Sequence, residues 1–258
     1  MTPLSPKRDL QYKLTIVTYL DIIGFRELII SKSPNFISRA IRRLQEETKS
    51  DYGKEYKSNY VPFSDLVIHT LPVETDANKK YRIGPVHDRI LHVCTAQAVL
   101  ISDEGLLLRG AITLGGMERS YGVIFGPALI AAYELERKKP HLPCVVIESQ
   151  MLSALKTNPI LRRHEYTDEA KYLRDLTRKD EKQNFVFADY LGAMQTQVEA
   201  SDYSYFMRRH KLFIEKRLSL YKRKPRILSK YEWLRQYHNE VVSERFTNKV
   251  RQTLAVAG

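Results

Sequence analysis

The sequence predicts an α+β protein, in which helices flank a mixed sheet and a mainly helical C-terminal extension follows. Residues 10–150 alternate short apolar, β-branched segments with longer segments of helical periodicity. Residues 151–258 are more polar and mostly compatible with helix, so we expect them to pack on the first domain as an extension. At 258 residues and 43% hydrophobic composition, the chain is long and apolar enough for a sizeable core.

The first elements are two strands separated by a helix. Residues 14–20 (LTIVTYL) form a buried strand that ends at Asp21 and a glycine turn. Residues 35–44 carry apolar side chains at helical intervals after a Ser-Pro pair, which is a favourable helix start. Residues 60–72 (YVPFSDLVIHTLP) are predicted as a second strand with Asp65 in its middle.

The alternation continues to residue 148. A helix is predicted over residues 92–101 and a third strand over 106–113, closed by Gly115 and its glycine neighbour. A helix over 127–136 begins with proline, and residues 143–148 form a fourth strand.

The extension is harder to assign. Residues 152–184 are polar and helix-compatible, whereas 185–191 (FVFADYL) fit either a late strand or a docking segment. Helices are expected from residue 199 onward. The expected docking residues near the end are Tyr231, Trp233, Leu234 and Tyr237.

The charge balance indicates an anionic partner. The chain has 42 Lys and Arg against 30 Asp and Glu, a net charge of +12, which suits nucleic acid, lipid or a nucleotide. Residues 201–230 alone hold ten basic residues against two acidic ones. We interpret this segment as the solvated face of a docked helix, with a nucleic-acid surface as the less favoured alternative.

Several classes of protein are disfavoured. No segment approaches the roughly 20 apolar residues that cross a bilayer, and the first ten residues lack the apolar core of a signal peptide. We therefore expect a cytoplasmic protein with no membrane partner. Cys94 and Cys144 lie in apolar runs and are expected to be buried thiols. No P-loop, GxSxG or CxxC motif occurs.

Two aspartates stand on segments that are otherwise almost wholly apolar. A buried, unpaired carboxylate is costly, so Asp21 and Asp65 each need a cation or hydrogen-bond donors. The turn formed by residues 22–25 follows Asp21 and offers backbone N–H groups to phosphate oxygens. If the two strands are neighbours, the carboxylates converge and form a site for Mg²⁺ or Mn²⁺ with a nucleoside triphosphate.

The order of motifs is similar to a known family. The succession VTYLDIIGF, FSDLVIHT, LRGAITLGG and VIFGPALIAAYELE resembles the class III nucleotide cyclase catalytic domain, which has a ferredoxin-like, palm-type fold. The resemblance covers about residues 15–150. With the tail KYEWLRQYHN at residues 230–239, the chain resembles more closely the pyrimidine nucleotide cyclases of bacterial antiphage Pycsar systems.

The resemblance implies roles for individual residues. Asp21 and Asp65 match the ligands of two divalent ions, Mn²⁺ or Mg²⁺, and Ile22 would offer its backbone carbonyl to the second ion. The turn that includes Gly24 and Phe25 would hold the triphosphate. The ribose 3′-hydroxyl would then attack the α-phosphorus and pyrophosphate would leave. The family also implies a homodimer with each active site at the interface.

Four positions depart from the purine-cyclase pattern. Val61 and Val123 stand where that pattern has the two base-selecting polar residues. Ile130 and Glu134 replace the Asn and Arg that usually steady the transition state. Purine recognition through those groups is therefore absent, and other donors must read the base.

Tyr60 and Arg109 are the nearest candidates for that task. Tyr60 lies beside the lost lysine, and Arg109 enters the third predicted strand. Arg109 has a second possible role, which is to stabilise the charge that develops on the phosphate.

The resemblance implies conversion of UTP to 3′,5′-cyclic UMP and pyrophosphate in antiphage defence, with a separate effector that responds to the product. CTP as the substrate stays open, because UTP and CTP differ by one acceptor-for-donor exchange. Two further alternatives are a catalytically inactive cyclase-like protein that binds nucleic acid, and a palm domain that makes a cyclic dinucleotide.

Overall fold

A mixed sheet forms the centre of the protein. The computed structural model describes residues 10–48, 56–120, 122–138 and 142–257. In that part of the chain eight strands occur in the order β2-β3-β1-β4-β6-β8-β7, and β5 pairs with β4. The strands are β1 (Lys13–Ile22), β2 (Asn59–Phe63), β3 (Leu66–Pro72), β4 (Leu108–Ser120), β5 (Val123–Phe125), β6 (Val145–Ile147), β7 (Thr177–Asp180) and β8 (Phe185–Ala188).

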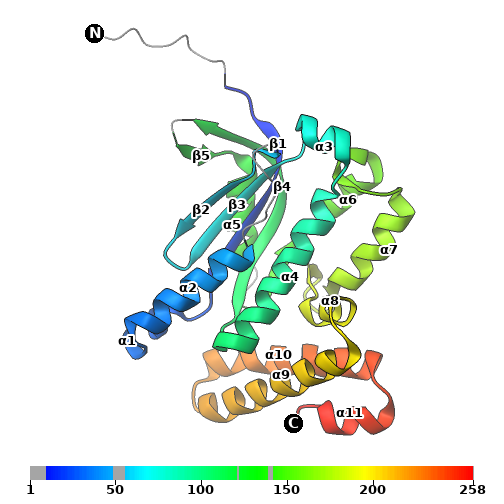
Figure 1. Cartoon of the computed structure of the whole chain (residues 1–258). Helices are drawn as coiled ribbons and strands as arrows, with labels where there is room; N and C mark the ends of the chain where they lie inside the picture. The colour runs from blue at the N-terminus through cyan, green and yellow to red at the C-terminus, as the bar shows by residue number, and fades with distance from the viewer. Residues whose placement is uncertain (1–9, 49–55, 121, 139–141, 258) are drawn as a thin grey trace.

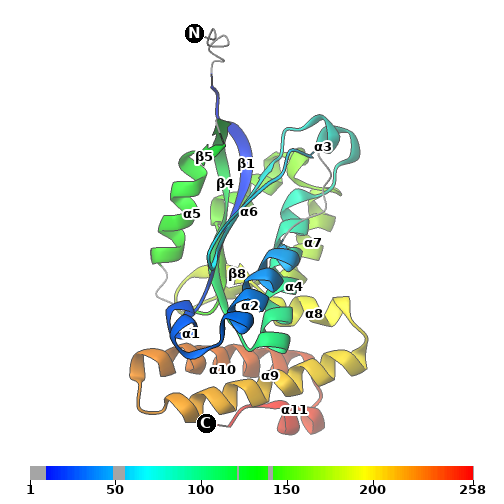
Figure 2. The ribbon, with the colours of Figure 1, turned by 60° about the vertical axis from the view of Figure 1, so that its left-hand side comes forward.

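Helices cover both faces of the sheet and one of its ends. Figure 2 shows α5 on one face and α2 with α4 on the other. Figure 1 shows α9, α10 and α11 grouped at one end of the sheet. Among the helices that the structure describes, none combines the length and apolar character needed to span a bilayer. The helices are α1 (Phe25–Ser31), α2 (Pro34–Thr48), α3 (Asp76–Tyr81), α4 (Pro85–Glu104), α5 (Pro127–Lys138), α6 (Ser149–Thr157), α7 (Tyr166–Leu176), α8 (Tyr190–Gln197), α9 (Ala200–Tyr221), α10 (Pro225–Arg245) and α11 (Asn248–Leu254), with a 3₁₀ turn η2 (Pro159–Leu161).

The first half of the chain has the predicted ferredoxin-like arrangement. In chain order the core is β1-α2-β2-β3-α4-β4, and the spatial order β2-β3-β1-β4 makes every neighbouring pair antiparallel. The predicted α+β class is therefore confirmed. Cys94 and Cys144 are both buried, as expected.

Alternation along β1 decides what each face of the sheet carries. Ile16 and Leu20 belong to the main core beneath α2 and α4. Val17 belongs to the smaller core with Ala128 and Ala132 of α5. Because successive side chains of a strand point to opposite faces, the odd-numbered residues of β1 lie on the α5 face.

The glycine pair at 115–116 does not end its strand, and that prediction was wrong. A Cβ atom at Gly115 would lie 3.2 Å from the Cβ atom of Ala128, and one at Gly116 would lie 2.9 Å from the Cβ atom of Tyr12. The glycines therefore let α5 and Tyr12 approach the strand closely. As a result β4 continues to Ser120 and forms a hairpin with β5.

The predicted single strand over residues 60–72 is two strands. A two-residue turn, Ser64 and Asp65, joins β2 to β3, and Ser64 takes the left-handed conformation with φ 59°. Residues 185–191 divide between β8 and the start of α8. Since β7 and β8 extend the sheet beyond β6, part of the C-terminal extension belongs to the central sheet.

A buried chain of hydrogen bonds ties the extension together. The Tyr190 hydroxyl lies 2.7 Å from His210 Nε2, and His210 Nδ1 lies 3.0 Å from His238 Nδ1. His238 Nε2 lies 2.9 Å from the Leu254 carbonyl oxygen. A carbonyl only accepts, so His238 Nε2 carries hydrogen and its Nδ1 accepts from His210. Both rings are neutral in this arrangement. Of the predicted docking residues, Tyr231, Leu234 and Tyr237 are buried and Trp233 is partly buried.

We expect acid to destabilise the protein through this pair of histidines. Burial lowers the pKa of His238 to about 4 and that of His210 well below its usual value. The unfolded chain therefore binds more protons between about pH 4 and 6.5, and stability falls as the pH drops through that window. Each histidine contributes about 1.4 kcal/mol per pH unit.

Urea unfolding between pH 4 and 8 measures this dependence. His238→Gln should lower the slope by about one proton, whereas the same change at exposed His164 should leave it unaltered. An unchanged slope in His238→Gln would contradict a neutral, buried pair.

Candidate active site

Asp21 ends β1 on the α5 face of the sheet and binds an arginine of the next strand. It pairs with Arg109 of β4 in the antiparallel ladder, so both side chains point to the same face. Arg109 Nε donates to Asp21 Oδ2 over 2.7 Å, and Arg109 Nη2 lies 2.6 Å from the same oxygen. The side chain of Asp21 is 15% exposed, so this ion pair is largely shielded from water.

Glu136 of α5 is a second acidic partner of Arg109, and sequence reasoning missed it. Its Oε1 lies 3.1 Å from Arg109 Nη1. Burial alone would lower the pKa of Arg109, but the hydrogen bond that Arg109 donates to Asp21 and the charges of Asp21 and Glu136 raise it. A signal was available, because Glu136 follows the buried residues Ala128 and Ala132 at intervals of one helical turn on the face of α5 that meets the sheet.

Asp65 reaches the same place from the turn between β2 and β3. Its carboxyl group lies within hydrogen-bonding reach of Asp21. Burial, that contact and the negative charge of Asp21 together raise the pKa of Asp65 to about 6. The structure therefore brings Asp21, Asp65 and Arg109 together, although Asp65 lies in a turn and not within a strand.

The two facing carboxylates suit a divalent cation. Among the residues that the structure describes, His, Cys, Asp and Glu form no cluster of three or more that could hold a metal ion. The chain offers the pair of Asp21 and Asp65 at this place. Two carboxylate ligands suit Mg²⁺ or Mn²⁺, because these ions fill their remaining coordination positions with water and phosphate oxygens. Repulsion between the carboxylates, visible in the raised pKa of Asp65, is what such an ion would relieve.

The turn after Asp21 is short and requires a glycine. Gly24 has φ 77° and stands immediately before α1, where a side chain would be strained. The side chains of Ile22 and Phe25 pack into or against the main core, so these residues present only their backbone to the site. The roles of Ile22, Gly24 and Phe25 in holding a triphosphate stay predictions.

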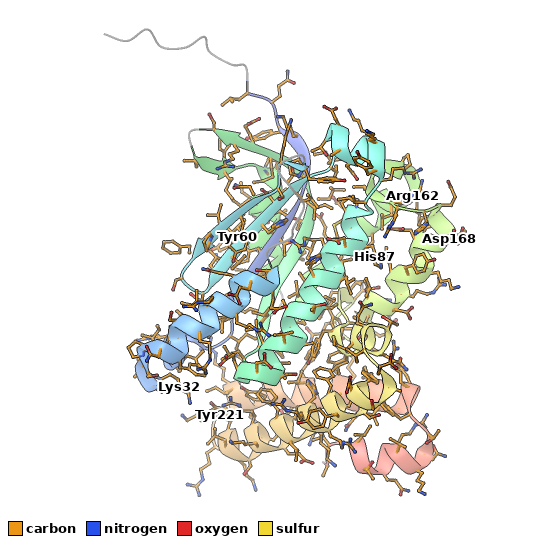
Figure 3. All side chains as sticks on the ribbon, in the orientation of Figure 1. Lys32, Tyr60, His87, Arg162, Asp168 and Tyr221 are labelled. Carbon is orange, nitrogen blue, oxygen red and sulfur yellow. The ribbon has the colours of Figure 1, made fainter. Side chains whose placement is uncertain are left out.

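Tyr60 does not join this group. It pairs with His69 in the β2–β3 ladder, and both residues face the core beneath α2 and α4. Burial raises the pKa of Tyr60 to about 12, and its hydroxyl lies beside Thr48 at the end of α2. Tyr60, labelled in Figure 3, is therefore on the opposite face of the sheet from Asp21, and this placement does not support a contact with the base.

Comparisons with known proteins return structural neighbours only. No protein-family model matches the chain. No curated protein matches it either. The adenylyl cyclase CyaB from P. aeruginosa is 16% identical, with a TM-score of 0.46 over 70% of this chain and 95% of that one.

Two further neighbours are guanylyl cyclases. The monomeric guanylyl cyclase domain of the RhoGC fusion protein from the aquatic fungus Blastocladiella emersonii is 12% identical, with a TM-score of 0.41 over 69% of this chain and 95% of that one. The catalytic core of a rhodopsin-guanylyl cyclase with converted specificity is 11% identical, with a TM-score of 0.42 over 69% of this chain and 96% of that one. At identities and scores this low, what the chain does has to be argued from its own residues.

We expect Asp65→Asn to stabilise the protein when divalent ions are absent. An amide donates to Asp21 and removes the charge that the native fold disfavours above about pH 6. The gain at pH 8 should be about 1 kcal/mol, since water screens a partly exposed pair, and it should vanish near pH 4.

Unfolding in chelator at pH 4 and pH 8 tests this expectation. Asp21→Asn is the matched control, because it removes the carboxylate to which Arg109 donates and leaves Glu136 as the acidic partner of that guanidinium, so it should not stabilise the protein. A destabilised Asp65→Asn variant at pH 8 would contradict the repulsion between the two carboxylates.

Proposed function

We propose that the protein is a nucleotide cyclase that acts on a pyrimidine nucleoside triphosphate. The observation that carries the proposal is the meeting of Asp21 and Asp65, from β1 and the β2–β3 turn, beside a glycine turn suited to phosphate. Paired carboxylates beside such a turn provide what an in-line attack of a 3′-hydroxyl on an α-phosphorus needs.

Each site residue has a separate proposed role in this reaction. Asp21, Asp65 and the carbonyl of Ile22 would hold two divalent ions, which when bound activate the ribose hydroxyl and offset phosphate charge. The turn at Gly24 orients the triphosphate. Arg109 keeps the Asp21 carboxylate in place through its contact at 2.6 Å. Its guanidinium would in addition stabilise the charge that develops on the phosphate.

The face that carries Asp21 offers no polar group at the positions that select purines. Val61 pairs with Ile68, which in turn pairs with Tyr19, so Val61 shares the face of Asp21. Val123 is 60% exposed and equally apolar. Because strong rejection of the wrong base needs polar groups that would be left unpaired, these valines support a cyclase that does not read purines in the usual way.

The finer assignment follows the family resemblance. We propose UTP as the substrate and cyclic UMP as the product, with CTP and cyclic CMP as the alternative. The setting would be antiphage defence in the cytoplasm, where a separate effector responds to the product.

The decisive measurement is the identity of the product. Each of the four nucleoside triphosphates is incubated with the purified protein and Mn²⁺, and the products are analysed by mass spectrometry. We expect a cyclic pyrimidine mononucleotide, and a loss of activity of at least about 100-fold in Asp21→Ala and Asp65→Ala, because each removes a metal ligand. Glu181→Gln, on an exposed loop, is the control for unaltered activity.

Cyclic AMP or cyclic GMP as the only product would overturn the pyrimidine assignment. A cyclic dinucleotide would favour the palm-domain alternative. No product, together with RNA binding that weakens steeply with salt and ignores Asp65→Ala, would favour the inactive nucleic-acid binder. Only the basic segment 201–230 supports that binder, and Arg209 and Lys211 of the segment already donate to carbonyl oxygens of Ser102 and Thr253.

A homodimer is the assembly that we propose. The α5 face exposes large apolar side chains: Phe63 is 75%, Ile130 62% and Tyr133 45% exposed. Tyr133 also contacts Tyr19, two residues before Asp21, with ring centroids 6.3 Å apart. A second copy on this face would bury that surface and close the candidate site from water.

We expect Ile130→Glu to yield a monomer with little cyclase activity, because a charge would be buried at the centre of the contact. Sedimentation velocity and product formation are the measurements. Leu212→Glu places the same charge on an equally exposed leucine of α9, 63% exposed, and should change neither. An active monomer would contradict the assembly.

A further inference from the structure

A cavity of about 690 Å³ lies between the turn that follows Asp21 and the C-terminal extension. The turn contributes Ile23 and Gly24, and the extension contributes side chains of α9 and α10. Figure 3 shows two of the lining residues, Lys32 after α1 and Tyr221 at the end of α9, close together at the base of the molecule. Segments about 200 residues apart in the sequence therefore share one pocket.

Cations outnumber carboxylates in the lining of this cavity. They are Lys32, Arg217, Arg226 and Lys230, against two carboxylates. One of these, Glu104, already receives two hydrogen bonds from Arg39, at 2.7 and 3.0 Å. The other is Glu27 of α1, which is exposed. The lining thus carries an excess of positive charge, which Glu27 offsets only in part at Lys230.

Among these cations, Arg226 and Lys230 have the fewest side-chain interactions with the rest of the protein. They stand four residues apart on α10 and so share one face of the helix. Arg217, by contrast, donates to the Gly105 carbonyl over 3.3 Å and lies over the ring of Phe213. Within the described part of the chain, no carboxylate lies within 4.0 Å of the side-chain nitrogens of Arg226 or Lys230.

Their position on α10 is unfavourable without a ligand. The first turn of α10 holds no acidic residue and does hold Arg226, although the helix dipole disfavours cations there. Lys230 is half-buried, and burial together with the charges of Arg109 and Arg226 lowers its pKa, with Glu27 acting in the opposite direction. An anion in the cavity would relieve this repulsion.

The turn that follows Asp21 connects this cavity to the candidate active site, whose Asp21, Asp65 and Arg109 do not themselves line the cavity. Lys230 is close enough to Arg109 for the two charges to interact, and Arg109 contacts Asp21 at 2.6 Å. Gly24, three residues after Asp21, is part of the lining. A polyphosphate chain whose α-phosphate lies at the aspartates would therefore extend along the turn toward α10.

We propose that Arg226 and Lys230 of the C-terminal extension bind the β- and γ-phosphates of the nucleoside triphosphate, so that the extension completes the substrate site. This inference rests on the proposed function. On this proposal the basic segment 201–230 contributes to substrate binding, because two of its cations would contact the phosphates that leave as pyrophosphate. Guanidinium and ammonium groups form the charge-assisted contacts that phosphate oxygens favour.

Kinetics of single variants test the proposal. Arg226→Gln and Lys230→Gln should each raise KM for the pyrimidine triphosphate about 10-fold or more, as expected for loss of a charged hydrogen bond. Lys230→Arg should recover most of the affinity. Arg223→Gln, an exposed position of the same extension outside the cavity, is the matched control and should behave as the parent protein.

Binding of inorganic tripolyphosphate, measured by titration calorimetry on the full chain, separates this inference from the proposed function. Binding that Lys230→Gln weakens and Arg223→Gln does not supports the phosphate site, even if no cyclic product forms and the cyclase proposal fails. If cyclic product forms and both glutamine variants keep parental KM and tripolyphosphate affinity, the inference is overturned while the cyclase stands. Circular dichroism and unfolding of each variant establish that the fold is retained.

Discussion

Two carboxylates held within hydrogen-bonding reach are the constraint on which the rest of the structure depends. The antiparallel pairing of β1 with β3 brings the β2–β3 turn to the end of β1, so Asp65 meets Asp21 by register and not by local sequence. The arrangement is unfavourable for two charged carboxylates, since burial together with the contact and charge of Asp21 raises the pKa of Asp65 to about 6. Two carboxylates that repel each other lower the stability of the fold, so such a pair is typical of a binding site and not of a purely structural contact.

Arg109 makes that constraint tolerable and connects it to the neighbouring layers. Its guanidinium joins Asp21 of the sheet to Glu136 of α5, and its charge reaches Lys230 of the extension. Arg109 is therefore held by the sheet and by α5 and is repelled by the charge of Lys230, and these three parts of the fold are far apart in the sequence. A change in how α5 or α10 packs would be felt at Asp21 through this one residue.

The sequence predicted the order of strands and helices in the first half because hydrophobic periodicity is local. It misjudged features that depend on packing: the glycines at 115–116 accommodate α5 and Tyr12 instead of ending β4. Tyr60 was placed by its neighbourhood in sequence, but strand alternation turns it to the opposite face. Glu136 was missed because an acidic residue at a helix end is ordinarily solvated, and only the fold shows the arginine beside it.

The distribution of polar groups on the α5 face limits how a base can be read. Asp21, Arg109 and Glu136 are already engaged with one another, while Val61 and Ile130 are apolar. Among these five residues, a single copy of the face has no unengaged polar side chain. In the proposed pyrimidine cyclase, hydrogen bonds that distinguish uracil from cytosine would therefore come from other groups: the hydroxyls of Tyr19 and Tyr133, backbone groups, or a second copy seated on the same face. If the second copy supplies them, base selection and dimer formation would be two aspects of one interface.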